Sequence, residues 1–408
     1  MAVDPVGRRQ SGMPSTPVST KTQVAVVGAG PAALMLTHLL ARAGIESVAI
    51  DLRSRQEIEE THRAGILEQD SVDLLVDTGV SERVLRDGYR HDGIELAFGG
   101  GSHRIDFQGL VGAATQLYPQ TDVFIDLADA RERDGGDVRF GVTDVSVDDL
   151  TDSPVVRFID SNGQGHQVRA DFVVGADGSR SLCRRTVPKA ERQQYFREYP
   201  FAWFGILAEA PPSAPELIYS HSPHGFALIS QRTETLQRMY FQCDPTEDAR
   251  TWSDDRIWER LQTSVGANGY TLKEGAITSR TVLPFRSFVQ EPMHHGRLVL
   301  AGDAAHTVPP TGAKGLNLAL ADVRVLAEEL ERAVTQDDLA PLATYSKRAL
   351  ARVWKAQHFS YRMTTMLHTL PHATPFDVRR QEGELAALTG SVAGSTYLAE
   401  AYTGWPAR

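Results

Sequence analysis

The sequence predicts an α/β protein, α+β overall, in which a doubly wound parallel-sheet domain carries an inserted β-sheet domain. Three observations predict this fold class. A strand, a glycine-rich turn, a helix and a second strand follow one another over residues 23–51. Apolar runs at 173–178 and 298–303 each end in an acidic turn, as parallel strands do at the ligand-binding edge of such a sheet. Residues 217–242 alternate β-type runs with turn residues, which indicates antiparallel strands.

The composition is that of a globular protein with a large core. The chain has 408 residues, of which 41% are hydrophobic and 23% charged, enough for two or three domains. A net charge of -10 disfavours nucleic acid or an anionic membrane as a partner, because both would repel it. The two cysteines, Cys183 and Cys243, lack metal-ligand spacing, so we expect no disulfide, no metal site and a cytoplasmic location. No apolar run approaches the roughly 18 residues of a membrane-spanning helix.

The first motif is a Rossmann-like dinucleotide pattern. Gly28 permits the tight turn, Gly30 lets a pyrophosphate approach the backbone, and Ala33 lets the helix pack closely on the strand. The helix N-terminus offers N–H donors to an anion, and Asp51 can accept from a ribose hydroxyl. The motif therefore predicts an ADP-containing cofactor. By itself it does not separate NAD from FAD, and a tight glycine turn that binds nothing is the alternative.

Two later strand ends narrow the choice of cofactor. Asp177 and Gly178 follow one apolar strand, and Gly302 and Asp303 follow another. Each pair alone also fits a solvated turn. Together with the first motif they resemble the three-part signature of the single-component FAD-dependent aromatic hydroxylases. The resemblance implies bound FAD, with Asp303 at the ribityl chain and Asp177 near the flavin and the nicotinamide donor. No second dinucleotide motif follows, so NADH or NADPH would bind without a domain of its own.

The resemblance also explains the glycine-punctuated residues 301–317, which would wrap the flavin ring, with an amphipathic helix behind them aimed at its carbonyl groups. Arg238 and Lys314 would add positive charge around the flavin, and Arg286 would help to seat the nicotinamide. The full set of residues expected to bind the cofactors is Gly28, Gly30, Ala33, Asp51, Arg63, Gln120, Asp177, Gly178, Arg238, Arg286, Gly302, Asp303, Pro310, Lys314, Gly315, Leu316 and Asn317.

A carboxylate site is predicted in the antiparallel segment. Ser230 and Arg232 are two residues apart on one strand and share a face, and Tyr240 lies on the next strand. A hydroxyl, a guanidinium and a phenol can together hold one carboxylate, with the arginine binding it through two hydrogen bonds. From spacing alone, an exposed strand arginine beside a serine remains the alternative.

From residue 22 onward the chain is similar to the 4-hydroxybenzoate hydroxylases of this family, in stretches such as RAGILEQ (63–69), ELIY (216–219) and GLNLA (315–319). The resemblance implies that Ser230, Arg232 and Tyr240 hold the substrate carboxylate and that Tyr219 bonds the phenol oxygen. Further residues expected at the substrate are Ile66, Trp203, Leu217, Leu228, Thr311 and Ala313.

The resemblance further implies a proton relay. Tyr402 would bond Tyr219, His91 would end the chain at solvent, and the Pro310 carbonyl would face the reacting side of the ring. Electrophilic hydroxylation favours a phenolate, and a buried phenol can lose its proton only along groups that both donate and accept. Histidine titrates near neutral pH and suits the end of such a relay. Taken singly, the tyrosines also fit core aromatics and the histidine a surface residue.

The expected activity is hydroxylation of 4-hydroxybenzoate at C3 to 3,4-dihydroxybenzoate by way of a flavin hydroperoxide, with NADH or NADPH and O2. One alternative keeps the fold but takes another para-substituted benzoate, either 4-aminobenzoate or 3,4-dihydroxybenzoate. A more distant alternative is a flavin reductase or redox sensor that never hydroxylates. For the donor, Glu57 would repel a 2'-phosphate whereas Arg53 and Arg55 could attract one, which favours NADH or dual use.

The expected domains follow from these motifs. Residues 1–20 form a disordered extension, because no apolar segment follows their arginine pair. Residues 21–195 and 285–345 make the FAD-binding domain, and residues 196–284 make the substrate domain. Residues 346–408 form a helical segment that closes the pocket through Tyr402 and contributes to a homodimer.

Overall fold

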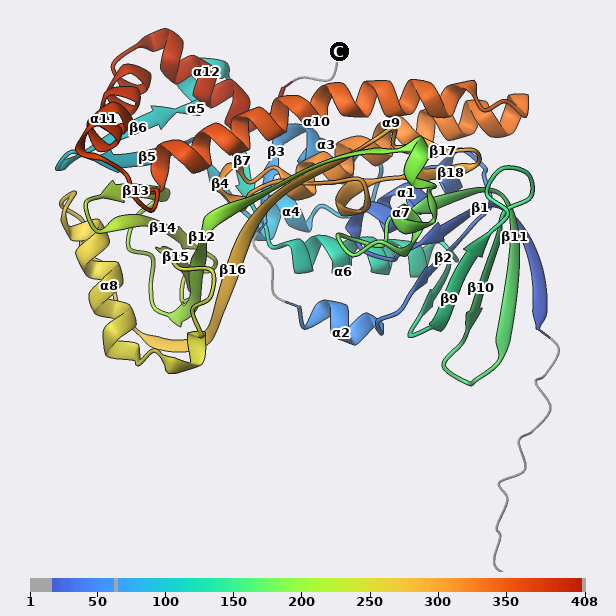
Figure 1. Ribbon diagram of the computed structural model, residues 1–408. Helices are drawn as coiled ribbons and strands as arrows, with labels where there is room; N and C mark the ends of the chain where they lie inside the picture. Colours follow the sequence, from blue (N-terminus) through green and yellow to red (C-terminus); the bar gives the residue numbers. More distant parts are fainter. Residues whose placement is uncertain (1–16, 62–64, 406–408) are drawn as a thin grey trace, which may run out of the picture.

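The structure is a computed structural model that describes residues 17–61 and 65–405. It contains two large sheets and one small one (Figure 1). The predicted α/β fold class is confirmed. Among the described residues, the helices are all too short or too polar to cross a membrane.

The first large sheet forms the doubly wound domain. Its parallel part runs in the order β18-β11-β1-β2-β8, with β17 antiparallel at one edge and the β9–β10 hairpin extending from β11. The bounds are β1 (Val18–Val27), β2 (Ser47–Asp51), β8 (Asp137–Phe140), β9 (Thr143–Asp148), β10 (Val155–Ile159), β11 (Gly165–Gly175), β17 (His294–His295) and β18 (Leu298–Leu300).

Helices pack against the apolar residues of this sheet and form one core with them. The predicted first helix is α1 (Pro31–Arg42), and the long helix behind residues 301–317 is α9 (Gly315–Gln336). The apolar stripe of α9 is buried as predicted at Leu320, Val323 and Leu326. The other helices of this part are α2 (Arg55–Glu59), α3 (Gln69–Asp77), α4 (Arg83–Asp87), α6 (Gln120–Arg133) and α7 (Leu182–Thr186).

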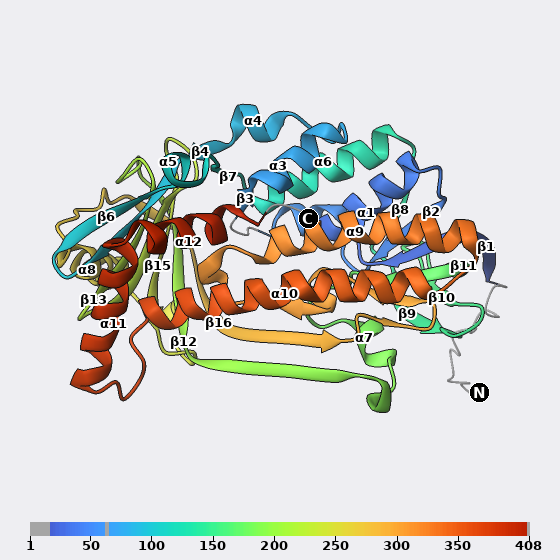
Figure 2. The ribbon, with the colours of Figure 1, turned by 90° about the horizontal axis from the view of Figure 1, so that it is seen from above.

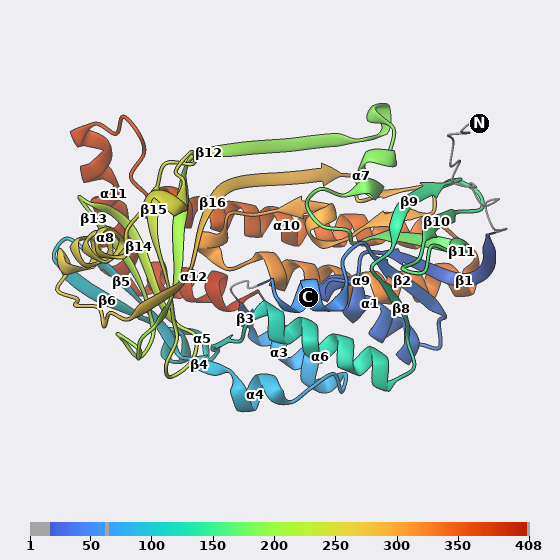
Figure 3. The same ribbon diagram turned by 90° about the horizontal axis from the view of Figure 1, so that it is seen from below.

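The second large sheet carries the predicted substrate segment. Its order is β19-β16-β12-β15-β14-β13-β5-β6. The bounds are β5 (Gly93–Phe98), β6 (Gly101–Asp106), β12 (Gln193–Glu209), β13 (Leu217–Ser222), β14 (Gly225–Gln231), β15 (Gln237–Cys243), β16 (Ala276–Glu291) and β19 (His306–Thr307). Viewed from below, β12 and β16 form a long ribbon that runs from this sheet toward the first domain (Figure 3).

Each face of the second sheet has its own core. One face packs against α8 (Asp254–Gly266). The opposite face packs against the C-terminal helices α10 (Ala340–Leu367), α11 (Pro375–Thr389) and α12 (Val392–Thr403), with the short α5 (Phe107–Val111) at its edge. Seen from above, α9 and α10 run side by side along the molecule (Figure 2). A small sheet of β3 (Ile66–Glu68), β7 (Thr115–Leu117) and β4 (Tyr89–His91) completes the fold.

The expected boundaries need three corrections. Residues 18–20, placed in the disordered extension, begin β1 and pair with residues 166–168 of β11, because β11 is long enough to offer them a partner. Residues 1–16 lie outside the described part of the chain. In addition, β5 and β6 join the substrate sheet although they precede residue 195, since β5 pairs with β13, and β16 crosses the expected boundary at 284/285.

Candidate active site

The glycine-rich turn has the geometry of an anion site. Gly28 has a φ of 111°, and a Cβ there would lie 2.3 Å from the Ala176 carbonyl oxygen. Gly30 caps α1 without a side-chain hydrogen bond, and a Cβ there would meet nothing within 4 Å. The first turn of α1 contains no acid, so its N–H groups remain available to an anion. Asp51 lies at this turn, where its Oδ2 accepts from the Ala29 N–H at 2.8 Å.

The two other strand-end motifs lie beside this turn, because β18, β11 and β1 are neighbours in the sheet. Asp177 uses Oδ2 to accept from the backbone N–H groups at the start of α7, whereas its buried Oδ1 has no partner among the described residues. Gly178 and Gly302 have φ values of 75° and 59°. Asp303 is half-buried in the turn after Gly302. The three motifs therefore meet at one edge of the sheet.

The N-terminus of α9 lies at the end of the loop of residues 301–317. Its N-cap residue, Lys314, makes no side-chain hydrogen bond to the helix, and a Cβ on Gly315 would meet nothing within 4 Å. The Asn317 side chain is not available to a cofactor, since it bonds the Ile66 and Ala313 carbonyls and the Glu68 N–H. The backbone N–H groups of the first turn of α9, Leu316 included, can instead face a carbonyl.

These features fit a flavin dinucleotide. The N-terminus of α1 can receive a pyrophosphate and that of α9 a ring carbonyl, and Asp177 Oδ1 at the same sheet edge is a buried acceptor. On the second sheet Arg238 Nη1 is a buried donor; among the described residues neither atom has a hydrogen-bond partner. Other expected contacts stay predictions. Gln120 is half-buried at the first position of α6, Arg286 donates to Ser179 Oγ at 2.8 Å, and Arg63 lies outside the described residues.

Lys314, which is expected to add positive charge around the flavin, is a buried residue. The residue is 1% exposed, and its Nζ donates to Glu68 Oε1 at 2.6 Å and to the Tyr402 carbonyl at 3.0 Å. Arg352 donates to the other Glu68 oxygen at 3.1 Å. A buried ammonium requires such partners, and burial still lowers the pKa of Lys314. The cluster joins β3, the start of α9 and the end of α12, which carries Tyr402.

Replacing Glu68 with glutamine is expected to lower the free energy of unfolding by about 3–5 kcal/mol, because the buried ammonium loses its counter-charge. Urea denaturation of the flavin-loaded protein measures this change. Glu259→Gln, on the exposed side of α8, removes a carboxylate without a buried partner and should change stability by less than about 0.5 kcal/mol. A Glu68→Gln loss below about 1 kcal/mol would contradict the buried ion pair.

Strand register brings the predicted substrate residues to one face of the second sheet. Tyr219 is paired with Leu228, and Leu228 is paired with Tyr240. Ser230, two residues beyond Leu228, therefore points to the same face. Gly205 lies opposite Tyr240, where a Cβ would come within 2.6 Å of the phenol ring. This face is the one that packs against the C-terminal helices, and Trp203 and Leu217 belong to the same core.

The predicted carboxylate site contains two neighbouring guanidinium groups. Arg232 lies just past the end of β14, half-buried, where burial and the charge of Arg238 lower its pKa and the charge of Asp122 opposes them. Ser230 Oγ donates to the Arg238 carbonyl at 3.0 Å. Tyr240 is buried, and the Arg238 guanidinium lies 5.4 Å from its ring centre. A bound anion would relieve the repulsion between the two arginines.

The central contact of the predicted relay is present. The hydroxyl oxygens of Tyr219 and Tyr402 are 2.7 Å apart, and Tyr219 donates to the Thr311 carbonyl at 3.3 Å. Both tyrosines are at most 2% exposed, and burial raises both pKa values. Ala313 and Pro310 lie in the same turn, where the Pro310 carbonyl accepts from the Ala313 N–H at 2.9 Å. The orientation of that carbonyl toward a substrate stays a prediction.

The expectation that His91 ends the relay at solvent is wrong for this conformation. His91 is 1% exposed because Gln231 covers it, with Gln231 Nε2 2.8 Å from His91 Nε2. Within the described part of the chain, no hydrogen bond joins His91 directly to Tyr402. Burial lowers the pKa of His91 to about 4.

Sequence patterns missed several residues that hold the pocket. His368 Nε2 accepts from the Trp203 indole N–H at 2.7 Å, and its Nδ1 donates to the Thr364 carbonyl at 2.8 Å. Thr364 also donates to Thr311 Oγ1 at 3.0 Å. These residues come from the C-terminal half of α10 and its end, and no short motif there marks them. Only the packing of α10 on the second sheet reveals their role.

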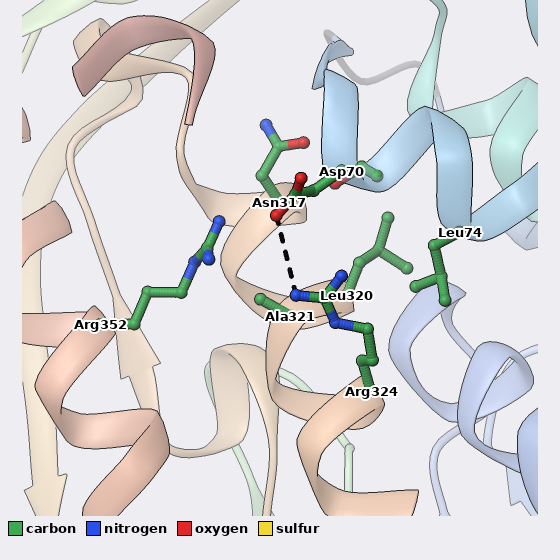
Figure 4. Close-up of a pocket in the computed structure, with 8 residues that line it drawn as sticks. Asp70, Leu74, Asn317, Leu320, Ala321, Arg324 and Arg352 are labelled. Carbon is green, nitrogen blue, oxygen red and sulfur yellow. Dashed lines mark ion pairs between the residues drawn. The ribbon is translucent and has the colours of Figure 1, made fainter. Parts of the chain in front are cut away.

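A small pocket between α3 and α9 is lined by none of the predicted substrate residues (Figure 4). Asp70 and Arg324 face each other across it, 3.7 Å apart, and Arg352 points into it from α10. Arg352 is already paired with Glu68. Because the charged groups lining this pocket have opposite charges beside them, it offers little attraction to a substrate carboxylate.

Comparison with known proteins agrees with the geometry. The family model described as the FAD binding domain matches residues 21–360. The chain belongs to the single-component FAD-dependent aromatic hydroxylases, and it is an FAD-dependent monooxygenase. Its relatives include p-hydroxybenzoate hydroxylase of Acinetobacter baylyi, which is 44% identical over 388 residues, covering 95% of this chain and 96% of that protein. A second relative, 6-methylpretetramide 4-monooxygenase of Streptomyces rimosus, is 30% identical and covers 79% of each chain.

Solved structures confirm the fold. The structure of p-nitrophenol 4-monooxygenase from Pseudomonas putida matches with a TM-score of 0.78 and 18% identity, over 96% of this chain and 100% of that one. The complex of aklavinone-11 hydroxylase with FAD and aklavinone matches with a TM-score of 0.70 and 24% identity, over 85% of this chain and 69% of that one.

Proposed function

We propose that this enzyme hydroxylates 4-hydroxybenzoate at C3. The reaction consumes O2, one NADH or NADPH and a proton, and gives 3,4-dihydroxybenzoate, water and the oxidised nicotinamide. The observation that carries the proposal is the 2.7 Å contact between the Tyr219 and Tyr402 hydroxyls, on the same sheet face as Ser230 and Tyr240. The 44% identity to p-hydroxybenzoate hydroxylase supports it.

Each group has a separate task in this reaction. Bound FAD supplies electron transfer from the nicotinamide and the activation of O2. Arg232, with Ser230 and Tyr240, anchors the carboxylate and so fixes the ring. Tyr219 accepts the phenol proton as it passes its own proton to Tyr402, which leaves a ring that is richer in electrons. The buried aromatic wall around Trp203 excludes water from the reacting oxygen.

Donor oxidation by the purified protein, with and without 4-hydroxybenzoate, tests this function when the product is separated by chromatography. We expect faster donor oxidation with substrate and one 3,4-dihydroxybenzoate per donor. Hydroxylation of 4-aminobenzoate or 3,4-dihydroxybenzoate in preference would favour the alternative substrates. Donor oxidation that yields only hydrogen peroxide with all of these acids would favour a reductase.

NADH is expected to be the better donor, with a kcat/KM roughly tenfold that of NADPH, as one unfavourable charge near the surface can produce. The arginines that could attract a 2'-phosphate are already engaged. Arg55 pairs with Glu59, Asp129 and Glu132, and Arg53 pairs with Asp51. Glu57 is exposed and fixed by its capping box with Ser54. Steady-state kinetics with both donors measures the preference.

Glu57→Gln isolates the charge, because glutamine at this position also forms a capping box. The variant is expected to narrow the preference by about two- to fivefold at low salt, and less at high salt. If the ratio of kcat/KM for NADH to that for NADPH does not change, the 2'-phosphate does not bind near Glu57.

We further propose a homodimer and a cytoplasmic location. Aromatic side chains exposed on neighbouring elements support the first, with Tyr195 and Phe196 on β12 beside Trp354 and Tyr361 on α10. The two free cysteines support the second. Light scattering of the purified protein tests the homodimer, and cell fractionation tests the cytoplasmic location.

A further inference from the structure

Gln231 occupies a position that links the carboxylate site to the end of the relay. It lies between Ser230 and Arg232 in sequence and is 6% exposed. Because side chains alternate along a strand, its amide points away from the pocket face and reaches His91 on β4. Its Nε2 also donates to the Pro215 carbonyl at 2.7 Å.

The Pro215 contact fixes the amide and, through it, the imidazole. A carbonyl oxygen only accepts, so the amide nitrogen of Gln231 must face Pro215, and its second N–H points to His91 Nε2. His91 Nε2 must then accept, and the neutral ring carries its proton on Nδ1. That Nδ1 is buried and has no hydrogen-bond partner among the described residues. In this arrangement neither ring nitrogen can take up a further proton without breaking the Gln231 contact.

The charges around His91 do not override this contact. Asp92 directly follows β4 and is paired with Arg90. Glu216 directly precedes β13 and is paired with Arg104. Both carboxylates favour a protonated imidazole, but burial outweighs them. Thr115, opposite His91 on β7, and Gln231 on β14 are uncharged.

We propose that Gln231 is a positioning residue of the relay, which holds His91 as the neutral tautomer protonated on Nδ1 and so prevents the terminal imidazole from retaining a proton at Nε2. This rests on the proposed function and on the predicted position of His91 at the end of the proton path; because His91 is buried beneath Gln231, that path reaches solvent only when the Gln231 contact opens. The contact keeps the imidazole neutral, so that at neutral pH it is ready to accept a proton when the contact opens and retains that proton poorly when the contact re-forms.

Nitrogen NMR of holoenzyme with 15N-labelled histidine tests the tautomer directly, with the His91 signals assigned by their loss in His91→Asn. We expect wild-type His91 to carry its proton on Nδ1. Gln231→Leu removes the donor that favours the neutral ring, so the proton affinity of His91 rises roughly tenfold. Gln231→Glu should raise it further, because a carboxylate accepts from a protonated Nε2. The acid limb of the kcat/KM profile moves to higher pH in the same order.

Gln237→Leu is the matched control. Gln237 pairs with Gln231 across the β14–β15 ladder, is fully buried and donates to the Pro211 carbonyl at 2.6 Å. In the part of the chain that the structure describes, it makes no hydrogen bond to His91. It should leave the His91 titration and the acid limb in place. An Nε2-protonated His91 in the wild type, or an unchanged titration in Gln231→Leu, would overturn the proposal. A shifted titration with a fixed acid limb would also overturn it. A wild type that makes no 3,4-dihydroxybenzoate refutes the proposed function instead, and the NMR result still decides the tautomer.

Discussion

Replacing Arg232 with methionine is expected to weaken binding of 4-hydroxybenzoate by about 2–5 kcal/mol, roughly 30- to 4000-fold. Methionine keeps the apolar stem of arginine and removes the guanidinium, so the substrate carboxylate would be half-buried without its strongest partner. The neighbouring Arg238 would recover only part of the attraction. Titration of the holoenzyme, followed by the flavin absorbance, gives the dissociation constant.

Two comparisons separate anchoring of the anion from general damage. Binding of 4-hydroxybenzamide, which has no carboxylate, should change far less in Arg232→Met than binding of the acid. Arg280 lies on β16 of the same sheet and is paired with Asp254 of α8. Arg280→Met should therefore leave the binding of both ligands unchanged. Arg232→Lys should fall between wild type and methionine, because lysine keeps the charge but not the two parallel hydrogen bonds. Equal losses for acid and amide would show that Arg232 does not anchor the carboxylate.

Local chemistry made the flavin side of the fold predictable. The turn at Gly28 must have a positive φ and no Cβ, and the strands before and after it are continuous apolar runs, so residues 23–51 specify their structure almost alone. Alternation along β14 predicted that Ser230 and Arg232 would share a face of one strand; Ser230 lies on the strand, but Arg232 lies just beyond its end at Gln231, so the strand does not extend as far as predicted. The family resemblance then supplied Tyr402, which lies 183 residues from Tyr219.

Contacts between distant residues were not predictable from patterns. Glu68 and Lys314 are 246 residues apart, and nothing in either neighbourhood shows that the lysine is buried against a carboxylate. His91 and Gln231 are 140 residues apart, so the burial of this histidine follows only from the approach of β4 to β14. The addition of β5 and β6 to the second sheet has the same cause, since strand pairing depends on tertiary packing.

These distant contacts give the C-terminal segment two functions. Its α12 places the Tyr402 hydroxyl against Tyr219, and the backbone carbonyl of Tyr402 accepts from Lys314. Tyr402, the second tyrosine of the proposed proton path, is therefore also bonded through its backbone to Lys314, the N-cap residue of α9. Displacement of α12 would break the relay and leave the Lys314 ammonium with one partner fewer.

Tyr219→Phe is expected to reduce formation of 3,4-dihydroxybenzoate by about 10²- to 10⁴-fold, the range for loss of a positioned proton-transfer group. Phenylalanine preserves the packing of the ring against Phe226 and removes only the hydroxyl that bonds Tyr402 and Thr311. Without it the bound phenol keeps its proton and its ring is a poorer target for electrophilic oxygen. Donor oxidation should continue, so the measured ratio of product to donor consumed falls and hydrogen peroxide replaces the product.

The companion variants show whether the hydroxyls act as one path. Tyr402→Phe should reduce product formation less, because Tyr219 still reaches the substrate, and the double variant should be no worse than Tyr219→Phe. Tyr345→Phe removes an equally buried hydroxyl, bonded to the Leu300 carbonyl outside the pocket, and should keep the product ratio of the wild type. Full coupling of donor oxidation to product in Tyr219→Phe would require another route for the proton. Additive losses in the double variant would mean that the two tyrosines act separately. If they belong to one proton path, removing either hydroxyl interrupts that path, and removing the second adds little.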